Sequence, residues 1–300
     1  MSINTIETAN KYTGELDKIM VQKAATGFFA DNLFSAKFVG AKTVLIPDID
    51  FVGLADYDRD DGFSKSGMTV AHTSYTLSKD RARKLMIDRE DMDESGIANL
   101  AGQILGEYIR TKVVPEMDAY ALSKLYKVAA DNAHTSVYNE DTAIADMVKI
   151  INSVQDKAGY DQELVAFVDG AMYSALMTSA EFSKQLIVSD FKQGEVNLKV
   201  KSLNGVAIIP VSSDRMKSEY VFDAGTTAST GGFAPADGAE DIRAIIIPKK
   251  AASLVKKTET LRIFTPAQNK DADAYEFNYR LYYDLFVKKS NIGTVYAIAG

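Results

Sequence analysis

The chain has 300 residues, a formal net charge of -7 and no cysteine. A hydrophobic fraction of 46% and a charged fraction of 25% are typical of a globular protein and exclude bulk disorder and collagen-like sequence. The absence of cysteine excludes a disulfide scaffold, a thiolate metal site and a cysteine nucleophile, and the acidic balance argues against a general nucleic-acid binder and a polybasic membrane anchor.

Residues 1–40 are expected to form an arm that is helical in part. Apolar residues recur at near-helical spacing from Ile19 to Phe28, and further phenylalanines follow as far as Phe38. No basic segment precedes an apolar run, so we expect no secretory signal peptide. No apolar run in the chain approaches the roughly 18 residues that span a bilayer. The arm is expected to need a surface to lie against.

Two strand candidates then enclose a polar loop. The first covers residues 42–51 and contains Pro47, which restricts it to a sheet edge or a bulge because proline has no amide hydrogen. The second covers residues 68–77, and the loop runs from Asp56 to Gly67. Ten residues in each strand would reach about 33 Å. An isolated two-stranded hairpin is marginally stable in water, so this excursion is expected to need a partner surface.

The loop contains two incomplete binding motifs. Gly62 and Gly67 have the spacing of a phosphate-binding loop, but a methionine follows where the motif needs a lysine. Asp56, Asp58 and Asp60 match the first three ligands of a calcium loop, but the glycine and the bidentate glutamate of that loop are missing. We expect a solvated acidic loop, and a weak cation contact stays open.

The two histidines, His72 and His134, lie far apart in the sequence, which excludes paired-histidine metal motifs. No nucleophile-elbow motif occurs. A serine–histidine–carboxylate triad assembles only in space, so the sequence leaves that class open. We expect both histidines to be ordinary strand or loop side chains.

Five acidic residues lie directly before a long helical pattern: Asp88, Glu90, Asp91, Asp93 and Glu94. Carboxylates at this place favour the positive end of a helix and can cap it. A carboxylate pair can also perform acid–base or two-metal chemistry. Capping is the preferred interpretation, and the chemical alternative stays open.

The pattern from Asp93 to Tyr126 predicts one helix of about 50 Å. Pro115 separates its two apolar halves and predicts a kink or a short break. A compact chain of this length has a radius of gyration near ~19 Å, so the helix would cross its whole width. The subunit is therefore expected to be flat or elongated.

The second half of the chain is expected to mix helices and strands. The expected helices cover residues 141–158, with Asn139 as N-cap, and residues 170–179, capped by Asp169. The expected strands cover residues 164–168, 196–203, 206–211, 242–248, 259–265, 274–288 and 292–299, with a tight turn at Asn204-Gly205. Residues 212–240 lose periodicity and are expected to form a long exposed loop.

This order of elements resembles the major capsid protein of tailed bacteriophages, in its siphophage group. The segment LSKDRARKLMIDREDMDES, followed by GQILGEYIRTKVVPEMDAYALSKLY, resembles the strand and spine helix of that family. FVDGAMYSALMTS and VKSLNGVAIIPV resemble its insertion domain, and YRLYYDLFVKKSNIGTVYAI resembles its C-terminal strands. The resemblance covers nearly the whole chain.

The resemblance implies an α+β fold, the Hong Kong 97-like capsid fold, with four parts. These are an N-terminal arm (residues 1–40), an extended loop (41–80), a peripheral domain with the spine helix (81–129 and 241–300) and an axial α/β domain (130–240). The extended loop is expected to overlap a neighbouring subunit.

The resemblance also implies a structural coat protein without catalytic residues, cofactor or metal. It would self-assemble into pentamers and hexamers of an icosahedral virion head around double-stranded DNA, by way of a procapsid in the bacterial host cytoplasm. Its expected partners are its own copies, a separate scaffolding protein, a portal and packaged DNA by non-specific proximity, with no membrane.

Charged residues of the extended loop and of the strand before the spine helix are expected to make contacts between subunits. They are Arg59, Asp60, Asp61, Lys65, Arg81, Arg83, Lys84, Asp88 and Asp91. Lys65 stands where some family members carry a cross-linking lysine, but no asparagine partner matches. Two alternatives remain: an encapsulin-type nanocompartment shell, and an α/β enzyme with Asp88, Glu90, Asp91 and His72 as candidate residues.

Overall fold

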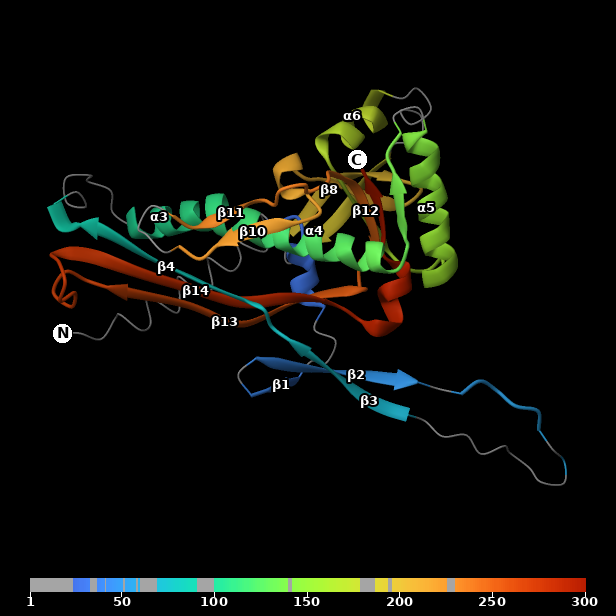
Figure 1. Cartoon of the computed structure of the whole chain (residues 1–300), viewed down its shortest axis with the longest axis horizontal. Coiled ribbons are helices and arrows are strands. Elements are labelled where there is room, and N and C mark those ends of the chain that lie inside the picture. The colour runs from blue at the N-terminus through green and yellow to red at the C-terminus, as the bar shows by residue number, and fades with distance from the viewer. Residues whose placement is uncertain are drawn as a thin grey trace.

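The computed structural model describes residues 24–32, 37–40, 42–50, 52–57, 59, 69–90, 100–139, 142–178, 187–193, 196–225 and 230–300. Figure 1 shows an elongated body with a thin excursion that projects from one side. Among the described residues, none of the helices has the length and apolar character needed to cross a bilayer.

The excursion is a small antiparallel sheet in the order β1-β2-β3. Its strands are β1 (Lys37–Val39), β2 (Thr43–Asp50) and β3 (Thr69–Thr76). The predicted pair of strands is confirmed, and β1 is an addition. Among the described residues, β1 pairs only with residues 43–45 of β2, so Pro47 has one described neighbouring strand, β3. The proline therefore sits where no second ladder needs its missing amide hydrogen.

A second sheet of long antiparallel strands has the order β13-β14-β4. It consists of β4 (Lys79–Asp88), β13 (Ala252–Phe264) and β14 (Ala274–Val287). β13 begins before the expected residue 259, because a bulge between Lys256 and Thr258 interrupts the alternation that the sequence shows. Alternate residues of β4 are half-buried and exposed, so one side of β4 faces the body.

The spine helix lies along this sheet (Figure 1). It consists of α3 (Leu100–Tyr108), a π-helical turn η2 (Ile109–Val113) and α4 (Val114–Asp131). The predicted interruption is present, as a π-turn directly before Pro115 rather than a break at it. Pro115 stands in the first turn of α4 and cannot donate a backbone hydrogen bond to the preceding turn of this continuous helix, which accounts for an interruption here. The expected residues 93–99 of the helix lie outside the described residues.

A third, seven-stranded sheet has the order β5-β15-β12-β6-β9-β8-β7. Its strands are β5 (Thr135–Val137), β6 (Leu164–Val168), β7 (Ile187–Gln193), β8 (Val196–Leu203), β9 (Val206–Pro210), β12 (Ile242–Pro248) and β15 (Tyr296–Ala299). β12 and β15 come from beyond residue 240, so this sheet combines strands from both sequence ranges expected to form separate domains.

The central strands β6 and β12 of the seven-stranded sheet are buried on both faces. Leu164, Ala166 and Val168 of β6 belong to a core with helices α5 (Ala143–Ala158) and α6 (Gly170–Thr178). The alternate residues of β6 belong to the main core, with the spine helix and the long sheet. Alternation along one strand thus joins the two cores.

The main core also holds the first described residues of the chain. A 3-10 helix η1 (Gly27–Asp31) places Phe28 and Phe29 with their ring centroids 6.0 Å from that of Phe167 in β6. Both side chains are almost fully buried. The base of the expected arm is therefore part of the body.

Two local predictions are confirmed and one is wrong. Asn204 and Gly205 have φ of 51° and 82°, as a tight hairpin turn requires. Asp169 Oδ1 accepts a hydrogen bond from the Met172 amide at 2.8 Å and caps α6. The N-cap of α5 is Thr142 rather than Asn139, and its hydroxyl donates to Asp146 within the helix at 2.6 Å.

The expected loop over residues 212–240 contains regular structure. It holds a 3-10 turn η3 (Ser213–Arg215) and an antiparallel hairpin of β10 (Tyr220–Asp223) and β11 (Gly232–Pro235). The strands are too short to show alternation, and a cluster of aromatic rings holds them. The expected final strand over residues 292–299 likewise begins with a 3-10 helix, η4 (Lys289–Thr294).

Candidate functional site

Several apolar side chains of the excursion are exposed to solvent. They are Phe38, Val39, Val52, Leu54 and Tyr57, with exposed fractions of 42%, 45%, 69%, 108% and 61%. The other large exposed apolar side chains of the described residues are scattered over separate elements. A cluster of this kind is typical of a protein–protein contact surface.

The base of the excursion is fixed to the body by a small core of its own. Val44, Ile46 and Leu77 pack there against Tyr282 and Phe286 of β14. The Leu77 amide donates to the Lys42 carbonyl at 2.8 Å, and the Tyr282 hydroxyl donates to the Leu77 carbonyl at 3.2 Å. The excursion therefore leaves the body from a defined base.

Asp284 of β14 joins this base to the spine helix. Its side chain is fully buried and accepts from Lys124 Nζ at 2.5 Å and from the Tyr120 hydroxyl at 2.7 Å. It also accepts from the Ser78 amide at 3.0 Å, at the point where β4 begins. Burial, followed by the charge of Asp284, raises the pKa of the Tyr120 hydroxyl, so the tyrosine remains a donor to this carboxylate.

Asp118 of α4 joins the base of the arm to the spine helix. Its fully buried carboxylate accepts from the amides of Ala25 and Thr26, each at 3.0 Å, and from the Thr26 hydroxyl at 2.7 Å. Arg215 of η3 lies 3.2 Å away and supplies a positive charge. Burial raises the pKa of Asp118, while the donors from Thr26 and Ala25 and the charge of Arg215 oppose that rise.

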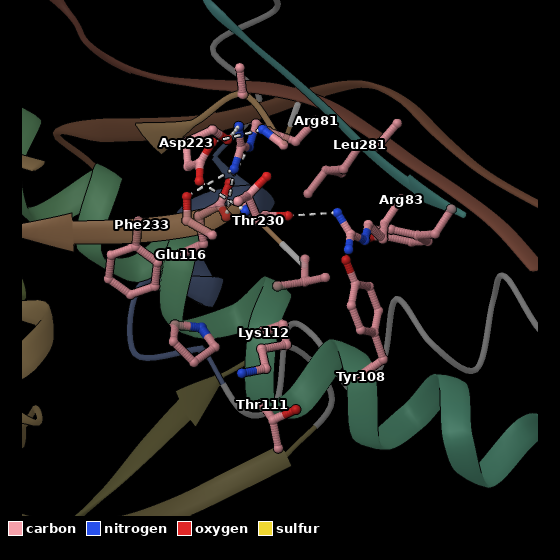
Figure 2. A pocket seen from close by; sticks show the side chains of 18 of the residues that line it. Arg81, Arg83, Tyr108, Thr111, Lys112, Glu116, Asp223, Thr230, Phe233 and Leu281 are labelled. Carbon is pink, nitrogen blue, oxygen red and sulfur yellow. Dashed lines mark hydrogen bonds and ion pairs between the residues drawn. The ribbon is translucent and has the colours of Figure 1, made fainter. Parts of the chain in front are cut away.

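A cavity of about 740 Å³ lies between β4, the spine helix and the β10–β11 hairpin (Figure 2). Its charged lining residues are Arg81, Arg83, Lys112, Arg215, Glu116, Asp214 and Asp223. Arg81 donates to both carboxylate oxygens of Glu116, from Nε at 2.6 Å and from Nη2 at 3.2 Å. Within the described part of the chain, no group of three or more histidine and carboxylate side chains is arranged to hold a metal ion.

The residues expected to make contacts between subunits fall into three groups. Asp60, Asp61, Lys65 and Asp91 lie outside the described residues, and Arg59 lies in an exposed turn of the excursion. Arg81, Arg83 and Lys84 have partners within the chain: Lys84 Nζ lies 2.7 Å from Glu276, and Arg83 donates to the Thr230 carbonyl at 2.8 Å. Asp88 is exposed and accepts from the Glu90 amide at 2.9 Å. Their role between subunits stays a prediction.

The described residues of the enzyme alternative are not brought together, and Asp91 lies outside them. His72 lies on the excursion in β3, whereas Asp88 and Glu90 lie at the far end of β4 (Figure 1). His134 stacks on Tyr296 with ring centroids 4.3 Å apart, and its Nε2 lies 3.1 Å from Lys157 Nζ. Asp118 and Asp284 were not predicted from the sequence, although a carboxylate within an apolar helical or aromatic strand pattern was a usable signal.

Acidification is expected to weaken two ion pairs. Arg280 holds the pKa of Asp80 below its ordinary 3.8, and Lys217 does the same for Asp241. A carboxyl with a lowered folded pKa contributes stability above its unfolded pKa and loses it as the pH falls through the folded value. The free energy of unfolding, measured by urea denaturation, should therefore decrease as the pH is lowered below about 4. The double variant Asp80→Asn, Asp241→Asn should show a shallower fall, and an unchanged pH dependence would contradict this assignment.

No protein-family model matches the sequence, and no curated protein matches it. Solved structures do match the fold. The mature capsid of bacteriophage PhiM1 is 16% identical with a TM-score of 0.55, covering 86% of this chain and 82% of that one. The capsid of cyanophage P-SCSP1u is 11% identical with a TM-score of 0.56, covering 88% and 84%. The capsid of Staphylococcus phage Andhra is 11% identical with a TM-score of 0.52, covering 88% and 81%.

These likenesses show the fold of the chain. It is the α+β, Hong Kong 97-like fold of phage capsid proteins, so the fold class expected from the sequence is confirmed.

Proposed function

We propose that this chain is the structural major capsid protein of a tailed bacteriophage. It self-assembles into pentamers and hexamers of an icosahedral head that encloses double-stranded DNA. The observation that carries the proposal is the excursion, which has a fixed base and an exposed apolar surface, on a body with the fold of phage capsids. Such a surface needs a partner, and a second copy of the chain supplies one in every closed shell.

The proposal assigns four parts to the chain. Residues 1–40 form the arm, 41–80 the extended loop, 81–129 and 241–300 the peripheral domain, and 130–240 the axial domain. Strands β12 and β15 are exceptions to this division, because they lie in the C-terminal range but belong to the seven-stranded sheet of the axial part. The long β13-β14-β4 sheet and the spine helix form the elongated peripheral part.

In the shell, the excursion of one subunit lies on the body of the next. Figure 1 shows it pointing away from the body, so its apolar residues are placed to reach another subunit. Arg59 and the aspartates beside it contribute charge at this contact, together with Lys65, Lys84, Asp88 and Asp91. Exposed pairs of this kind contribute only about 0–1 kcal/mol each, so apolar burial supplies most of the affinity.

Other partners follow from the same proposal. A separate scaffolding protein directs assembly in the bacterial cytoplasm, a portal occupies one vertex, and DNA fills the interior without specific contacts. The net charge of -7 supports this arrangement, because an acidic wall does not hold a polyanion. In this proposal the subunit has a structural role and catalyses no reaction.

Replacing Val52, Leu54 and Tyr57 together with serine tests the proposal. The purified wild-type chain is expected to elute in size-exclusion chromatography as capsomers or megadalton particles, and the triple variant as a folded smaller species. These side chains are 69%, 108% and 61% exposed, so their loss leaves the core intact. Circular dichroism should show unchanged folding, because surface substitutions typically change stability by about 0.5 kcal/mol or less.

A matched control replaces Val137 and Tyr160, which are 79% and 75% exposed on the seven-stranded side. This variant should assemble better than the triple variant. A wild-type chain that elutes only as a compact monomer would overturn the shell proposal. Normal particles from the triple variant would show that the excursion is not part of the interface.

A further inference from the structure

Three cationic side chains at alternate positions of β4 all contact the β10–β11 hairpin. Lys79 Nζ lies 3.6 Å from the ring centroid of Phe222 in β10. Arg81 Nη1 donates to the Asp223 carbonyl at 2.7 Å, and Arg83 Nη1 donates to the Thr230 carbonyl at 2.8 Å. Because alternate residues of a strand share a face, all three reach the hairpin from the body-facing side of β4.

Arg81 is the central contact of the three. Its guanidinium binds the Glu116 carboxylate at two points and also donates to the carbonyls of Asp223 and Gly232, at 2.7 Å and 3.1 Å. One side chain therefore joins β4, the spine helix and both strands of the hairpin. Figure 2 shows these bonds converging on Arg81, with Arg83 bonded separately to Thr230.

The hairpin belongs to the other half of the molecule. It lies in the chain between β9 and β12, which are both strands of the seven-stranded sheet. Its connection is closed by the Asp223 carboxylate, which accepts from the amides of Gly225 and Gly231 at 2.8 Å and 3.1 Å. Both glycines have positive φ, a conformation that other residues rarely adopt. The hairpin thus presents its carbonyls to β4 in a defined geometry.

The hairpin also lies against the spine helix. The Ser123 hydroxyl donates to the Ser218 carbonyl at 2.7 Å, and the rings of Tyr120 and Phe222 meet edge to face with centroids 5.8 Å apart. Contacts to β4 on one side and α4 on the other leave the hairpin little freedom to rotate. The hairpin therefore connects the long sheet to the seven-stranded sheet.

We propose that Lys79, Arg81 and Arg83 form a clasp that, together with the shared main core, sets the angle between the seven-stranded sheet and the β13-β14-β4 sheet. These are positioning residues, and the contacts of the clasp lie within one subunit. A further consequence, which rests on the proposed function, is that this angle selects the curvature of the assembled shell. Small errors in the angle would repeat in every subunit and accumulate around a closed particle.

The clasp depends on hydrogen-bond geometry rather than on charge alone. Two of its three members bind backbone carbonyls, and Arg81 binds three acceptor groups at once. A lysine keeps the charge but presents a single ammonium, so it cannot reproduce the planar fork. Arg81→Lys should therefore weaken the clasp nearly as much as Arg81→Gln.

Hydrogen exchange measured on the full-length chain tests the clasp directly. In Arg81→Lys and Arg81→Gln, amides of β10 and β11 should exchange about tenfold faster or more, because several charge-assisted bonds are lost. Amides of β6 should keep their protection, which shows that each variant is folded. Arg83→Gln, which removes the bond to Thr230, should give a smaller change in the same peptides.

Arg280→Gln is the matched control. Arg280 binds Asp80 at 2.6 Å and 2.8 Å, also through two bonds, but on the exposed face of the same sheet. It should leave exchange in the hairpin unchanged. Wild-type exchange rates in the hairpin of both Arg81 variants would overturn the clasp.

Electron microscopy of assembled material tests the curvature. The Arg81 variants should form particles of mixed diameter or open sheets, whereas Arg280→Gln should form particles of the wild-type diameter. Fast hairpin exchange together with particles of uniform wild-type diameter would overturn the link to curvature. A wild-type chain that forms no particles would overturn the proposed function, and hydrogen exchange would still decide whether the clasp exists.

Discussion

Replacing Asp118 with alanine is expected to lower the free energy of unfolding by about 3–5 kcal/mol. The change leaves the amides of Ala25 and Thr26 without their acceptor in a region where Thr26 is fully buried. It also removes the partner of Arg215, which is 27% exposed and regains some solvation. Urea unfolding followed by circular dichroism measures the loss.

The same variant should release the base of the arm. Hydrogen exchange at Ala25 and Thr26 should increase more than exchange in β14. Asp131→Ala provides the control, since Asp131 is exposed at the end of the same helix and should change stability by about 0.5 kcal/mol or less. If the two alanine variants were equally stable, Asp118 would not anchor the arm.

Replacing Asp284 with alanine is expected to lower the free energy of unfolding by about 3 kcal/mol or more and to prevent particle formation. The Ser78 amide and the Tyr120 hydroxyl lose their acceptor, and Lys124 loses its counter-charge. Because Ser78 lies directly between the excursion and β4, the excursion should lose its fixed direction. Urea unfolding and size-exclusion chromatography measure the two effects.

Asp80→Ala is the control for this variant. Asp80 pairs with Arg280 on the exposed face of the same sheet, and its side chain is 42% exposed. Its loss should change stability by about 1 kcal/mol or less and leave assembly intact. Normal particles from the Asp284 variant would show that the small core at Leu77 alone directs the excursion.

Local chemistry was predictable from the sequence. The turn at Asn204-Gly205 and the cap at Asp169 depend on neighbouring residues, and both are found as expected. The β10–β11 hairpin was not predictable, because strands of four residues carry no measurable period and rely on ring packing. The fold class came from the resemblance of several segments in order, since the fold has no single diagnostic motif.

The anchoring carboxylates could not be assigned partners from the sequence. Asp118 binds residues 92 and 93 positions away, and Asp284 binds Ser78 across 206 positions. Arg81 and Arg83 were predicted to make contacts between subunits, which stays a prediction, and their contacts with the β10–β11 hairpin of the same chain were not predicted. Which charges pair over long range depends on how the sheets pack against one another, and the local patterns of a single sequence do not show that packing.

The last two described strands in chain order lie inside their sheets. β15 lies between β12 and β5, and β14 lies between β13 and β4. Neither sheet can be completed before these strands leave the ribosome, and pairings between strands so distant in sequence form slowly. The excursion's own three strands all precede residue 77, whereas its base on β14 and the two larger sheets of the body are completed only by strands far along the chain.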